Sequence, residues 1–345
     1  MMNASAYHSL RVSAVVEETP DAKSFVLEVP AEKSTAFQYR MGQFLTLRLP
    51  IDDRNVLRCY SLASSPLEDE PLRITVKRVA GGRASNWLCD NVRAGDQLNV
   101  MKPAGIFSPK SLEGDFLMFG GGSGITPLMS IVRSVLSAGN GRICLLYANR
   151  DERSIIFREE LQSLARRYPS RLQVVHWLDS VQGIPAVEQL ANIAQPWRRA
   201  NCFICGPASF MDAAVQAMES IDADPARVHV ERFVSLPDET SEEQAASVVS
   251  DDAASLEVKV HLDGVAYTVA CGSDETILDA MLRGGVDAPY SCRSGACATC
   301  MCVVASGAVR MKRNEVLDDR EIEQGWTLAC QAVAESEDVV VRFPE

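Results

Sequence analysis

The residues with the clearest chemistry are four cysteines near the C-terminus. Cys292, Cys297 and Cys300 follow one another in a C-x4-C-x2-C pattern, and Cys330 lies further along the chain. A [2Fe–2S] cluster takes four cysteine thiolates, and this spacing supplies three from one loop and one from another segment. Gly295 leaves room for the loop backbone to approach the cluster, where N–H groups help to set the reduction potential. The spacing therefore predicts a [2Fe–2S] site.

A structural zinc site is the alternative for the same thiols. Zinc sites usually combine two separate C-x2–4-C pairs, whereas here two short spacings share one cysteine, which favours the cluster. The chain has 11 cysteines, an odd number that fits metal or redox chemistry better than a disulfide framework. We expect six of the others to be small buried residues: Cys59, Cys89, Cys144, Cys202, Cys271 and Cys302.

A glycine-rich run, GGGSGITP, occupies residues 120–127. It follows a short apolar run and precedes a helical pattern, so we expect a turn between a strand and a helix. Glycines let the backbone approach a phosphate, and a helix N-terminus favours negative charge. Pro127 stands where the dinucleotide fingerprint has its third glycine. The context favours phosphate binding, with a simple tight turn as the alternative.

Two stretches of the N-terminal third could also contact a cofactor. The run RCYSL at 58–62 combines a cation, an aromatic ring and a hydroxyl, although an ordinary half-exposed strand would show the same pattern. The run GGRASNWL at 81–88 places two glycines before Ser85, at the start of an expected short helix. That arrangement is a second candidate phosphate cradle.

The elements that must position these residues fall into three blocks. Up to about residue 110, alternating stretches at 24–29, 44–49 and 72–77 predict short antiparallel strands in a barrel or sandwich. Strands then alternate with helices, which indicates a parallel sheet covered on both faces. We expect strands over 116–119, 143–147, 172–178, 202–205 and 228–233, and helices from 127, over 154–168, near 186–194 and over 207–220.

The pattern of the last block, residues 254–345, predicts a compact α+β unit. Strict alternation predicts a hairpin of 256–262 and 265–269, followed by a helix over 276–283 and a final strand at 339–341. Before it, residues 236–253 are acidic, rich in serine and alanine, and lack a sustained apolar stripe. We expect them to form a flexible linker.

The charge of the chain, −12, is concentrated in its C-terminal third. Residues 254–345 carry 8 basic and 15 acidic residues, and 234–253 carry six acids, which leaves the first 233 residues at +1. An acidic chain does not suit nucleic-acid binding. We find no apolar run long enough for a membrane span and no secretory signal, so we expect a cytoplasmic protein without membrane insertion. We also expect a monomer.

Together, these motifs resemble the ferredoxin–NADP reductase superfamily. RCYSLASS at 58–65 is similar to its flavin-binding motif, GGGSGITP to its pyridine-nucleotide turn, and Cys205-Gly206-Pro207 to its second nucleotide motif. SCRSGACATC at 291–300 resembles the plant-type ferredoxin loop. The order is similar to the reductase components of bacterial oxygenases, among them those of 3-ketosteroid 9α-hydroxylase and phenylacetyl-CoA oxygenase. The resemblance covers nearly the whole chain except the linker.

The resemblance implies a multidomain fold. An antiparallel β-barrel FAD domain would occupy 1–110 and an α/β parallel-sheet NAD(P)-binding domain 111–235. After the linker at 236–253, an α+β ferredoxin domain of the β-grasp type would occupy 254–345.

The same resemblance implies roles for the flavin-site residues. Arg58 would meet the pyrophosphate of FAD, and Tyr60 would lie against the isoalloxazine. Ser61 would hydrogen-bond near the ring nitrogen that accepts hydride. Gly82 and Ser85 would hold the FAD phosphates.

Further roles are implied in the nucleotide block. Gly122, Gly124 and Thr126 would cradle the nicotinamide nucleotide, and Cys205 with Gly206 would lie near the nicotinamide. Glu231 and Phe233 belong to a segment whose acid lies near the hydride path and whose aromatic ring covers the flavin. For Phe233 and Cys205 a plain buried residue is the alternative.

The implied function is electron transfer from NADH, with NADPH as the alternative, through FAD and the [2Fe–2S] cluster to a terminal oxygenase. The candidate partner is a Rieske-type 3-ketosteroid 9α-hydroxylase, and another oxygenase such as phenylacetyl-CoA epoxidase is the alternative. A flavin links a two-electron donor to a one-electron acceptor. Two alternatives belong to other functional classes. A partner-independent flavin reductase or diaphorase would make no use of the ferredoxin block. A redox sensor would need a DNA-binding or signalling domain to report the state of its cluster, and the sequence shows none.

Overall fold

The computed structural model describes residues 7–233 and 256–344, except 53, 69, 291, 292, 294, 296, 297, 315 and 318. The predicted linker at 236–253 and the predicted ligands Cys292 and Cys297 therefore lie outside the described residues.

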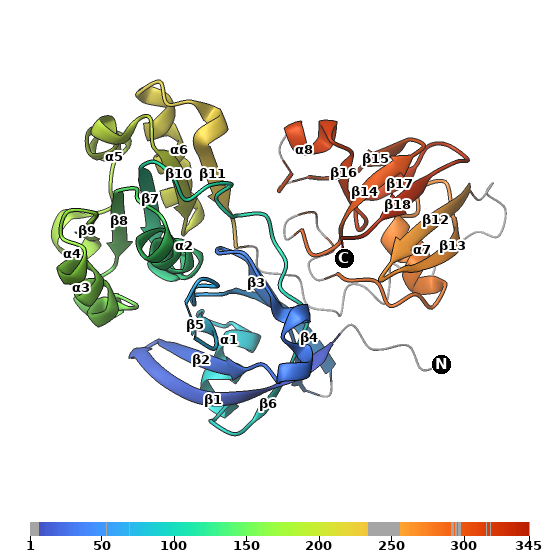
Figure 1. The fold of residues 1–345 in the computed structure, drawn as a ribbon, viewed down its shortest axis with the longest axis horizontal. Coiled ribbons are helices and arrows are strands. Elements are labelled where there is room, and N and C mark those ends of the chain that lie inside the picture. Colours follow the sequence, from blue (N-terminus) through green and yellow to red (C-terminus); the bar gives the residue numbers. More distant parts are fainter. Residues whose placement is uncertain are drawn as a thin grey trace.

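The first domain is built on one six-stranded antiparallel sheet, drawn in blue to cyan in Figure 1. Its strands follow the order β4-β3-β6-β1-β2-β5. A bridge between Leu62, just after β4, and Ile74 in β5 joins the two edges of the sheet. The sheet therefore closes into a barrel around alternate apolar residues such as Leu45 and Leu47, both fully buried. The strands are β1 (His8–Thr19), β2 (Ala22–Glu28), β3 (Phe44–Ile51), β4 (Arg54–Ser61), β5 (Leu72–Lys77) and β6 (Gln97–Val100).

The barrel also carries helical segments. The 3-10 turns η1 (Ala31–Lys33) and η2 (Thr35–Phe37) follow β2, and helix α1 (Arg83–Asn91) follows β5. Leu88 and Cys89 on α1 are buried against the barrel core.

The second domain is a five-stranded parallel sheet in the order β11-β10-β7-β8-β9. Two separate apolar cores cover its faces: α2 and α3 contribute to one, and α5 and α6 contribute to the other. The strands are β7 (Phe116–Gly121), β8 (Ile143–Asn149), β9 (Leu172–Leu178), β10 (Asn201–Cys205) and β11 (Val228–Glu231). The helices are α2 (Ile125–Ala138), α3 (Arg158–Arg167), α4 (Asp179–Gln182), α5 (Val187–Ala194) and α6 (Ala208–Ser220), with short 3-10 turns η3 (Gly122–Gly124), η4 (Glu152–Ser154), η5 (Gln195–Trp197) and η6 (Pro225–Arg227).

Some predicted boundaries in this domain are wrong. The helix predicted over 154–168 starts only at Arg158, because Asp151 and Ser154 cap the separate turn η4 and Phe157 adopts a left-handed backbone with φ of 59°. Local side-chain caps of this kind compete with helix formation. The helix expected from Pro127 begins two residues earlier, at Ile125, since proline is tolerated in a first turn.

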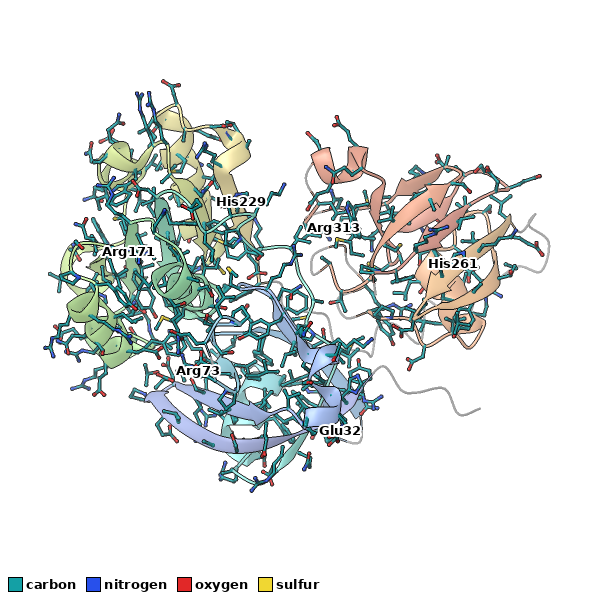
Figure 2. All side chains as sticks on the ribbon, in the orientation of Figure 1. Glu32, Arg73, Arg171, His229, His261 and Arg313 are labelled. Atoms are coloured by element: carbon teal, nitrogen blue, oxygen red, sulfur yellow. The ribbon has the colours of Figure 1, made fainter. Side chains whose placement is uncertain are left out.

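A buried polar network joins the first two domains. The Ser130 hydroxyl of α2 donates to Ser64 O at 2.6 Å. The Arg133 guanidinium, also on α2, bonds the carboxylates of Glu68 and Glu160. Arg73 of β5 forms two further bonds with Glu160 of α3, and Figure 2 labels it at this boundary. The network fixes how the carboxyl ends of the parallel strands face the barrel.

The third domain is a mixed sheet with one helix packed against it, the β-grasp arrangement, drawn in orange and red in Figure 1. Its main sheet has the order β13-β12-β18-β14-β16, in which only β12 and β18 are parallel, and β15 pairs with β17. The elements are β12 (Leu256–Leu262), β13 (Val265–Cys271), α7 (Ile277–Arg283), β14 (Met301–Ser306), β15 (Val309–Met311), α8 (Asp319–Glu323), β16 (Trp326–Leu328), β17 (Ala332–Ala334) and β18 (Val340–Arg342).

None of the helices in the described ranges combines the length and apolar character that a bilayer crossing requires.

Candidate flavin, nucleotide and cluster sites

The flavin-like motif lies on β4, hydrogen-bonded to β3. Arg58 and Tyr60 pair with Leu47 and Leu45, and strand alternation places these two side chains on one face and Ser61 on the other. Burial raises the pKa of the Tyr60 phenol, so it stays protonated. A cation and an aromatic ring therefore lie on the same face of β4, and their contacts with a flavin stay a prediction.

The start of α1 is shaped by a glycine and a serine. The hydroxyl of Ser85 accepts a hydrogen bond from the Val79 N–H at 3.1 Å. A Cβ on Gly82 would lie 2.7 Å from that hydroxyl and 3.0 Å from the Val79 Cβ, so a larger residue would displace the Ser85 hydroxyl. The N-cap residue of α1 is Gly82, which has no side chain to cap the first N–H groups of the helix, and this suits a phosphate at this end. The contact of Ser85 with a phosphate stays a prediction.

The two nucleotide motifs touch through their backbones. A Cβ on Gly124 would lie 2.1 Å from the Cys205 carbonyl oxygen, and one on Gly206 would lie 2.9 Å from the Gly121 Cα. Gly122 adopts a left-handed backbone with φ of 52° in the turn between β7 and α2. The carboxyl ends of β7 and β10 therefore form one cradle, where open α/β sheets bind their ligands.

The remaining turn residue, Thr126, is buried and used locally. Its hydroxyl donates to the Ser123 carbonyl at 3.1 Å. This bond braces the turn, and a contact of Thr126 with the nucleotide stays a prediction.

Tyr147 of β8 holds the same turn in place through its hydroxyl. Its fully buried hydroxyl donates to the Gly122 carbonyl at 3.1 Å and accepts from the Ile156 N–H at 3.2 Å. Sequence reasoning missed this residue, since a tyrosine in a buried strand looks like any other core aromatic.

Three charged groups from both domains meet beside the glycine turn. Lys77 at the end of β5 has its Nζ 3.5 Å from the position of a Cβ on Gly122. The carboxylate of Asp21, in the β1–β2 turn, lies 2.8 Å from the Arg150 Nη2 and 4.0 Å from the Lys77 Nζ. Thr19 orients Asp21 through a hydroxyl bond of 2.7 Å. Burial lowers the pKa of Lys77.

Three predicted catalytic residues also come together. Glu231 at the end of β11 is in register with Cys205 at the end of β10, and its carboxyl lies beside the Ser61 hydroxyl of β4. Burial of the carboxyl, and secondly the Cys59 thiol, raises the pKa of Glu231 to about 8, although the nearby Ser61 hydroxyl lowers it. The Oε2 atom is buried without a hydrogen-bond partner in the described part of the chain.

Cys205 itself is fully buried, and burial, then Glu231, raises the pKa of its thiol well above the usual value. The thiol is therefore neutral. Its backbone forms part of the nucleotide cradle, and a direct side-chain role at the nicotinamide stays a prediction.

Phe233 is not a buried residue in the core of a strand, which is the alternative prediction for this position. The strand predicted over 228–233 ends at Glu231, and the Phe233 side chain beyond it is 47% exposed. An exposed aromatic ring next to the end of β11 fits the predicted cover of a flat cofactor.

The cluster cysteines that are described lie side by side. The backbone N–H of Cys330 donates to the Cys300 Sγ at 3.4 Å, so two distant segments that each carry a predicted ligand meet in a buried place. In the preceding loop, Arg293, Gly295 and Ala298 all have left-handed backbones. This geometry is consistent with a loop that curls around a cluster.

Comparisons with known proteins agree with this geometry. Residues 9–108 match the oxidoreductase FAD-binding domain, 118–216 the oxidoreductase NAD-binding domain, and 260–335 the 2Fe-2S iron-sulfur cluster binding domain. Over 337 residues the chain is 50% identical to the ferredoxin reductase component of 3-ketosteroid-9-alpha-monooxygenase from Rhodococcus rhodochrous, covering 97% of this chain and 96% of the relative. The chain belongs to this family of oxygenase reductase components.

Other relatives are consistent with that assignment. One of the subunits of 1,2-phenylacetyl-CoA epoxidase from Escherichia coli is 36% identical over 355 residues, with 98% of both chains covered. Among solved structures, phthalate dioxygenase reductase shares the fold with a TM-score of 0.61 and 24% identity, again with 98% of both chains covered. The predicted three-domain oxidoreductase that uses FAD, a nicotinamide nucleotide and a [2Fe–2S] cluster is thereby confirmed.

The residues of the reductase fit these three groups. The α1 N-terminus with Gly82 and the backbone cradle at Gly122 and Gly124 offer N–H donors for phosphates, and Cys300 with Cys330 supplies two of the four thiolates that a cluster needs. The orphaned Oε2 of Glu231 lies where the barrel meets the nucleotide cradle.

Of the six cysteines expected to be buried core residues, five are: Cys89, Cys144, Cys202, Cys271 and Cys302. Cys59 differs, because it is only half-buried beside Glu231, with its Sγ 3.5 Å from the Thr46 hydroxyl. A position on the flavin motif, at the edge of the site, explains the difference.

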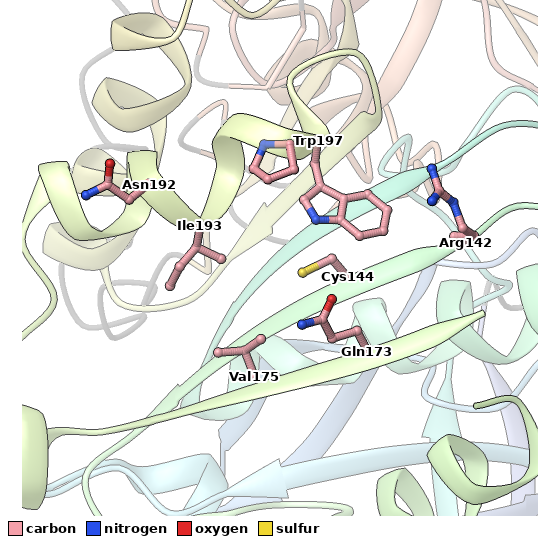
Figure 3. Close-up of a pocket in the computed structure, with 8 residues that line it drawn as sticks. Arg142, Cys144, Gln173, Val175, Asn192, Ile193 and Trp197 are labelled. Carbon is pink, nitrogen blue, oxygen red and sulfur yellow. The ribbon is translucent and has the colours of Figure 1, made fainter. Parts of the chain in front are cut away.

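The reductase also has a separate pocket of about 430 Å³ between β8–β9 and the α5–η5 segment (Figure 3). Trp197 and Ile193 form one wall, and Cys144 and Gln173 lie opposite. The latter two are the second residues of β8 and β9. The pocket therefore lies at the amino ends of the strands, away from the nucleotide cradle.

Proposed function

We propose that this reductase takes electrons from NADH at the junction of its barrel and nucleotide domains and delivers them through its ferredoxin domain to a separate terminal oxygenase. The observation that carries the proposal is the proximity of the Ser61 hydroxyl of the barrel to the Glu231 carboxyl of the nucleotide domain, beside Cys205. It brings the flavin motif and the nucleotide cradle to one place. When bound, the flavin accepts two electrons as hydride and releases them singly.

The chain's own residues bind and orient the reactants. Arg58, Gly82 and Ser85 would hold the FAD phosphates, while Tyr60 and Phe233 would contact the ring from the barrel and from the end of β11. Gly122, Gly124, Thr126 and Gly206 would hold the nucleotide so that its nicotinamide lies near Cys205. Ser61 and Glu231 would place a hydroxyl proton and a neutral carboxyl beside the reacting atoms.

A preference for NADH is supported by the charges near the ribose end of the cradle. Arg150 follows β8, where a 2′-phosphate would be recognised, and its guanidinium bonds Asp21. Asp151 is next in sequence, and an acid there suits a free ribose hydroxyl. Comparison of kcat/KM for the two nucleotides tests this preference, and a tenfold preference for NADPH would refute it.

The cluster would be held by Cys292, Cys297, Cys300 and Cys330. An optical spectrum with only flavin bands, after anaerobic purification and cluster reconstitution, would contradict the cluster step. A Cys330→Ala variant should keep NADH-dependent dye reduction and lose electron delivery to an oxygenase. If delivery persists at the normal rate, the chain is instead a flavin reductase or diaphorase.

The oxygenase partner is proposed from the relatives. A 3-ketosteroid 9α-hydroxylase is favoured because the relative at 50% identity is a component of that system, and a phenylacetyl-CoA epoxidase is the second candidate because one of its subunits is 36% identical. Purified reductase paired with each oxygenase, with NADH oxidation and product measured together, decides between them.

The acidic ferredoxin domain is proposed to steer the chain towards a basic patch on that partner. Residues 254–345 carry 15 acids against 8 bases, and opposite charges speed association at low salt. The oxygenase-coupled rate should therefore fall as ionic strength rises. A rate that is flat with salt would mean that the acidity serves solubility alone.

A further inference from the structure

Gln331 is a buried polar residue directly after the fourth cluster cysteine. Its side chain is 8% exposed and lies between Cys330 and β17. The side-chain Nε2 donates to the Arg293 carbonyl at 2.8 Å and lies 3.7 Å from the Cys330 Sγ. One amide therefore bridges the two segments that carry the cluster ligands.

The orientation of this amide follows from its partners. The Arg293 carbonyl can only accept a hydrogen bond, so the NH2 end of Gln331, and not its oxygen, must face that carbonyl. The second N–H of the same NH2 group is then available to the Cys330 sulfur, which is within sulfur hydrogen-bond range. A thiolate has no proton of its own and is a pure acceptor.

The bridge is rigidly held. The Gln331 N–H donates to the Leu328 carbonyl at 2.8 Å, and the Gln331 carbonyl accepts from the Lys312 N–H at 2.9 Å. A Cβ on Gly295 would lie 3.1 Å from the Gln331 Cγ, so the side chain packs directly against the ligand loop. These contacts hold the Gln331 side-chain amide in place independently of the redox state of the cluster.

We propose that Gln331 is a positioning residue that raises the reduction potential of the [2Fe–2S] cluster by donating a hydrogen bond to the Cys330 sulfur. Reduction adds one electron and no compensating charge, and a buried donor aimed at a ligand sulfur stabilises the added negative charge. The same NH2 group ties the loop at Arg293 to the ligand. The inference rests on the proposed role of Cys330 as a cluster ligand.

The test is an EPR-monitored redox titration of the full-length, cluster-loaded reductase. Gln331→Leu keeps the side-chain size and removes the donor. We expect it to make reduction of the cluster three- to tenfold less favourable, which is about 30–60 mV since a tenfold change in a one-electron equilibrium is 59 mV. An unchanged midpoint potential in a fully loaded variant would overturn the proposal.

Asn314→Leu is the matched control. The Asn314 amide also braces a loop of this domain, through Leu317 O at 2.8 Å and the N–H groups of Val316 and Leu317, and no bond from it to a sulfur is found in the described part of the chain. If Gln331 only braced its loop, both variants would lose stability and leave the potential unchanged. We expect only Gln331→Leu to shift the potential.

A second measurement covers the case in which Gln331→Leu does not load its cluster. Pulsed EPR of the reduced wild-type protein, with ¹⁵N in the glutamine side-chain amides, should show a weak ¹⁵N coupling to the cluster. A loaded, reduced cluster without that coupling would overturn the proposal. A wild-type chain that never shows a [2Fe–2S] signal would instead contradict the proposed cluster ligands.

Discussion

The Ser61 hydroxyl lies beside the Glu231 carboxyl at the boundary between the barrel and the parallel sheet, although 170 positions separate the two residues in the chain. Ser61 ends β4 and Glu231 ends β11. Their proximity brings the flavin motif and the nucleotide cradle together, so variants of either residue test the proposed hydride step directly.

Glu231→Gln should remove a pH dependence of flavin reduction by NADH. Because the pKa of Glu231 is raised to about 8, the carboxyl is neutral below that pH and negative above it. A negative charge beside the flavin opposes the arrival of hydride, so the wild-type rate should fall as pH rises through about 8, in stopped-flow experiments. The variant should be flat in this range.

Glu18→Gln is the control for that experiment. Glu18 also has a pKa raised by burial and also accepts a hydrogen bond from a serine, Ser24. It lies on β1 and should leave the pH profile of flavin reduction unchanged. A profile that stays steep in Glu231→Gln would show that another group titrates.

Ser61→Ala should slow flavin reduction by about ten- to a hundredfold, since a hydrogen bond to a charged or reacting group contributes about 1.5–3 kcal/mol. FAD content should stay normal, because the cofactor's phosphates are held elsewhere. Ser13→Ala, which removes a hydroxyl bonded to the Val26 carbonyl on the same barrel, should have no such effect.

The effects of Ser61→Ala and Glu231→Gln on the rate of flavin reduction should not be additive. Because Ser61 and Glu231 lie side by side and interact, the rate of the double variant should be close to that of the slower single variant. Full additivity in this cycle would mean that the two side chains act independently.

Sequence patterns predicted the positions of the motifs but not the contacts between them. The glycine turn, the Cys205–Gly206 motif and the strand around Ser61 each carry a local signature of residue type and spacing. That Gly124 leaves no room for a Cβ against the Cys205 carbonyl depends on the packing of β7 beside β10, which no local pattern encodes.

The sequence patterns also did not predict the side chains that support the site from outside the motifs. Tyr147 and Gln331 act through hydrogen bonds to groups 25 and 38 residues away in the chain, and Asp21 reaches Arg150 from another domain. The start of α3 was predicted too early because periodicity registers the apolar residues before Arg158 and misses the capped turn and the left-handed Phe157.

Tyr147→Phe should weaken NADH binding more than it slows turnover. Loss of the hydroxyl removes the partner of the half-buried Gly122 carbonyl and of the buried Ile156 N–H, and leaving the Ile156 N–H unsatisfied costs about 1–3 kcal/mol before relaxation. We expect a several-fold higher KM for NADH with kcat nearly unchanged, and a lower Tm. Tyr39→Phe removes a hydroxyl bonded to Ser64 at 2.8 Å and should leave KM unchanged.

Gly124→Ala should be far more damaging than its size suggests. The added methyl would lie 2.1 Å from the Cys205 carbonyl oxygen, so the turn must move away from β10, and such overpacking costs about 1–3 kcal/mol or more. We expect loss of measurable NADH binding by titration, with FAD retained. Gly272→Ala, whose methyl would meet nothing closer than 3.6 Å, should bind NADH normally.

Asp21→Asn should increase the use of NADPH. The Asp21 carboxylate now holds the Arg150 guanidinium at 2.8 Å, and that guanidinium is exposed enough to turn towards a 2′-phosphate once its partner is neutral. We expect kcat/KM for NADPH to rise by roughly three- to tenfold, an effect of about 1 kcal/mol, with little change for NADH. Asp115→Asn removes the same charge from a pair with Arg142 before β8, at the amino end of the sheet, and should change neither value. If Asp21→Asn leaves the NADH-to-NADPH ratio as it is, the contact with Arg150 plays no part in cofactor choice, and the acid at Asp151 becomes the residue to test.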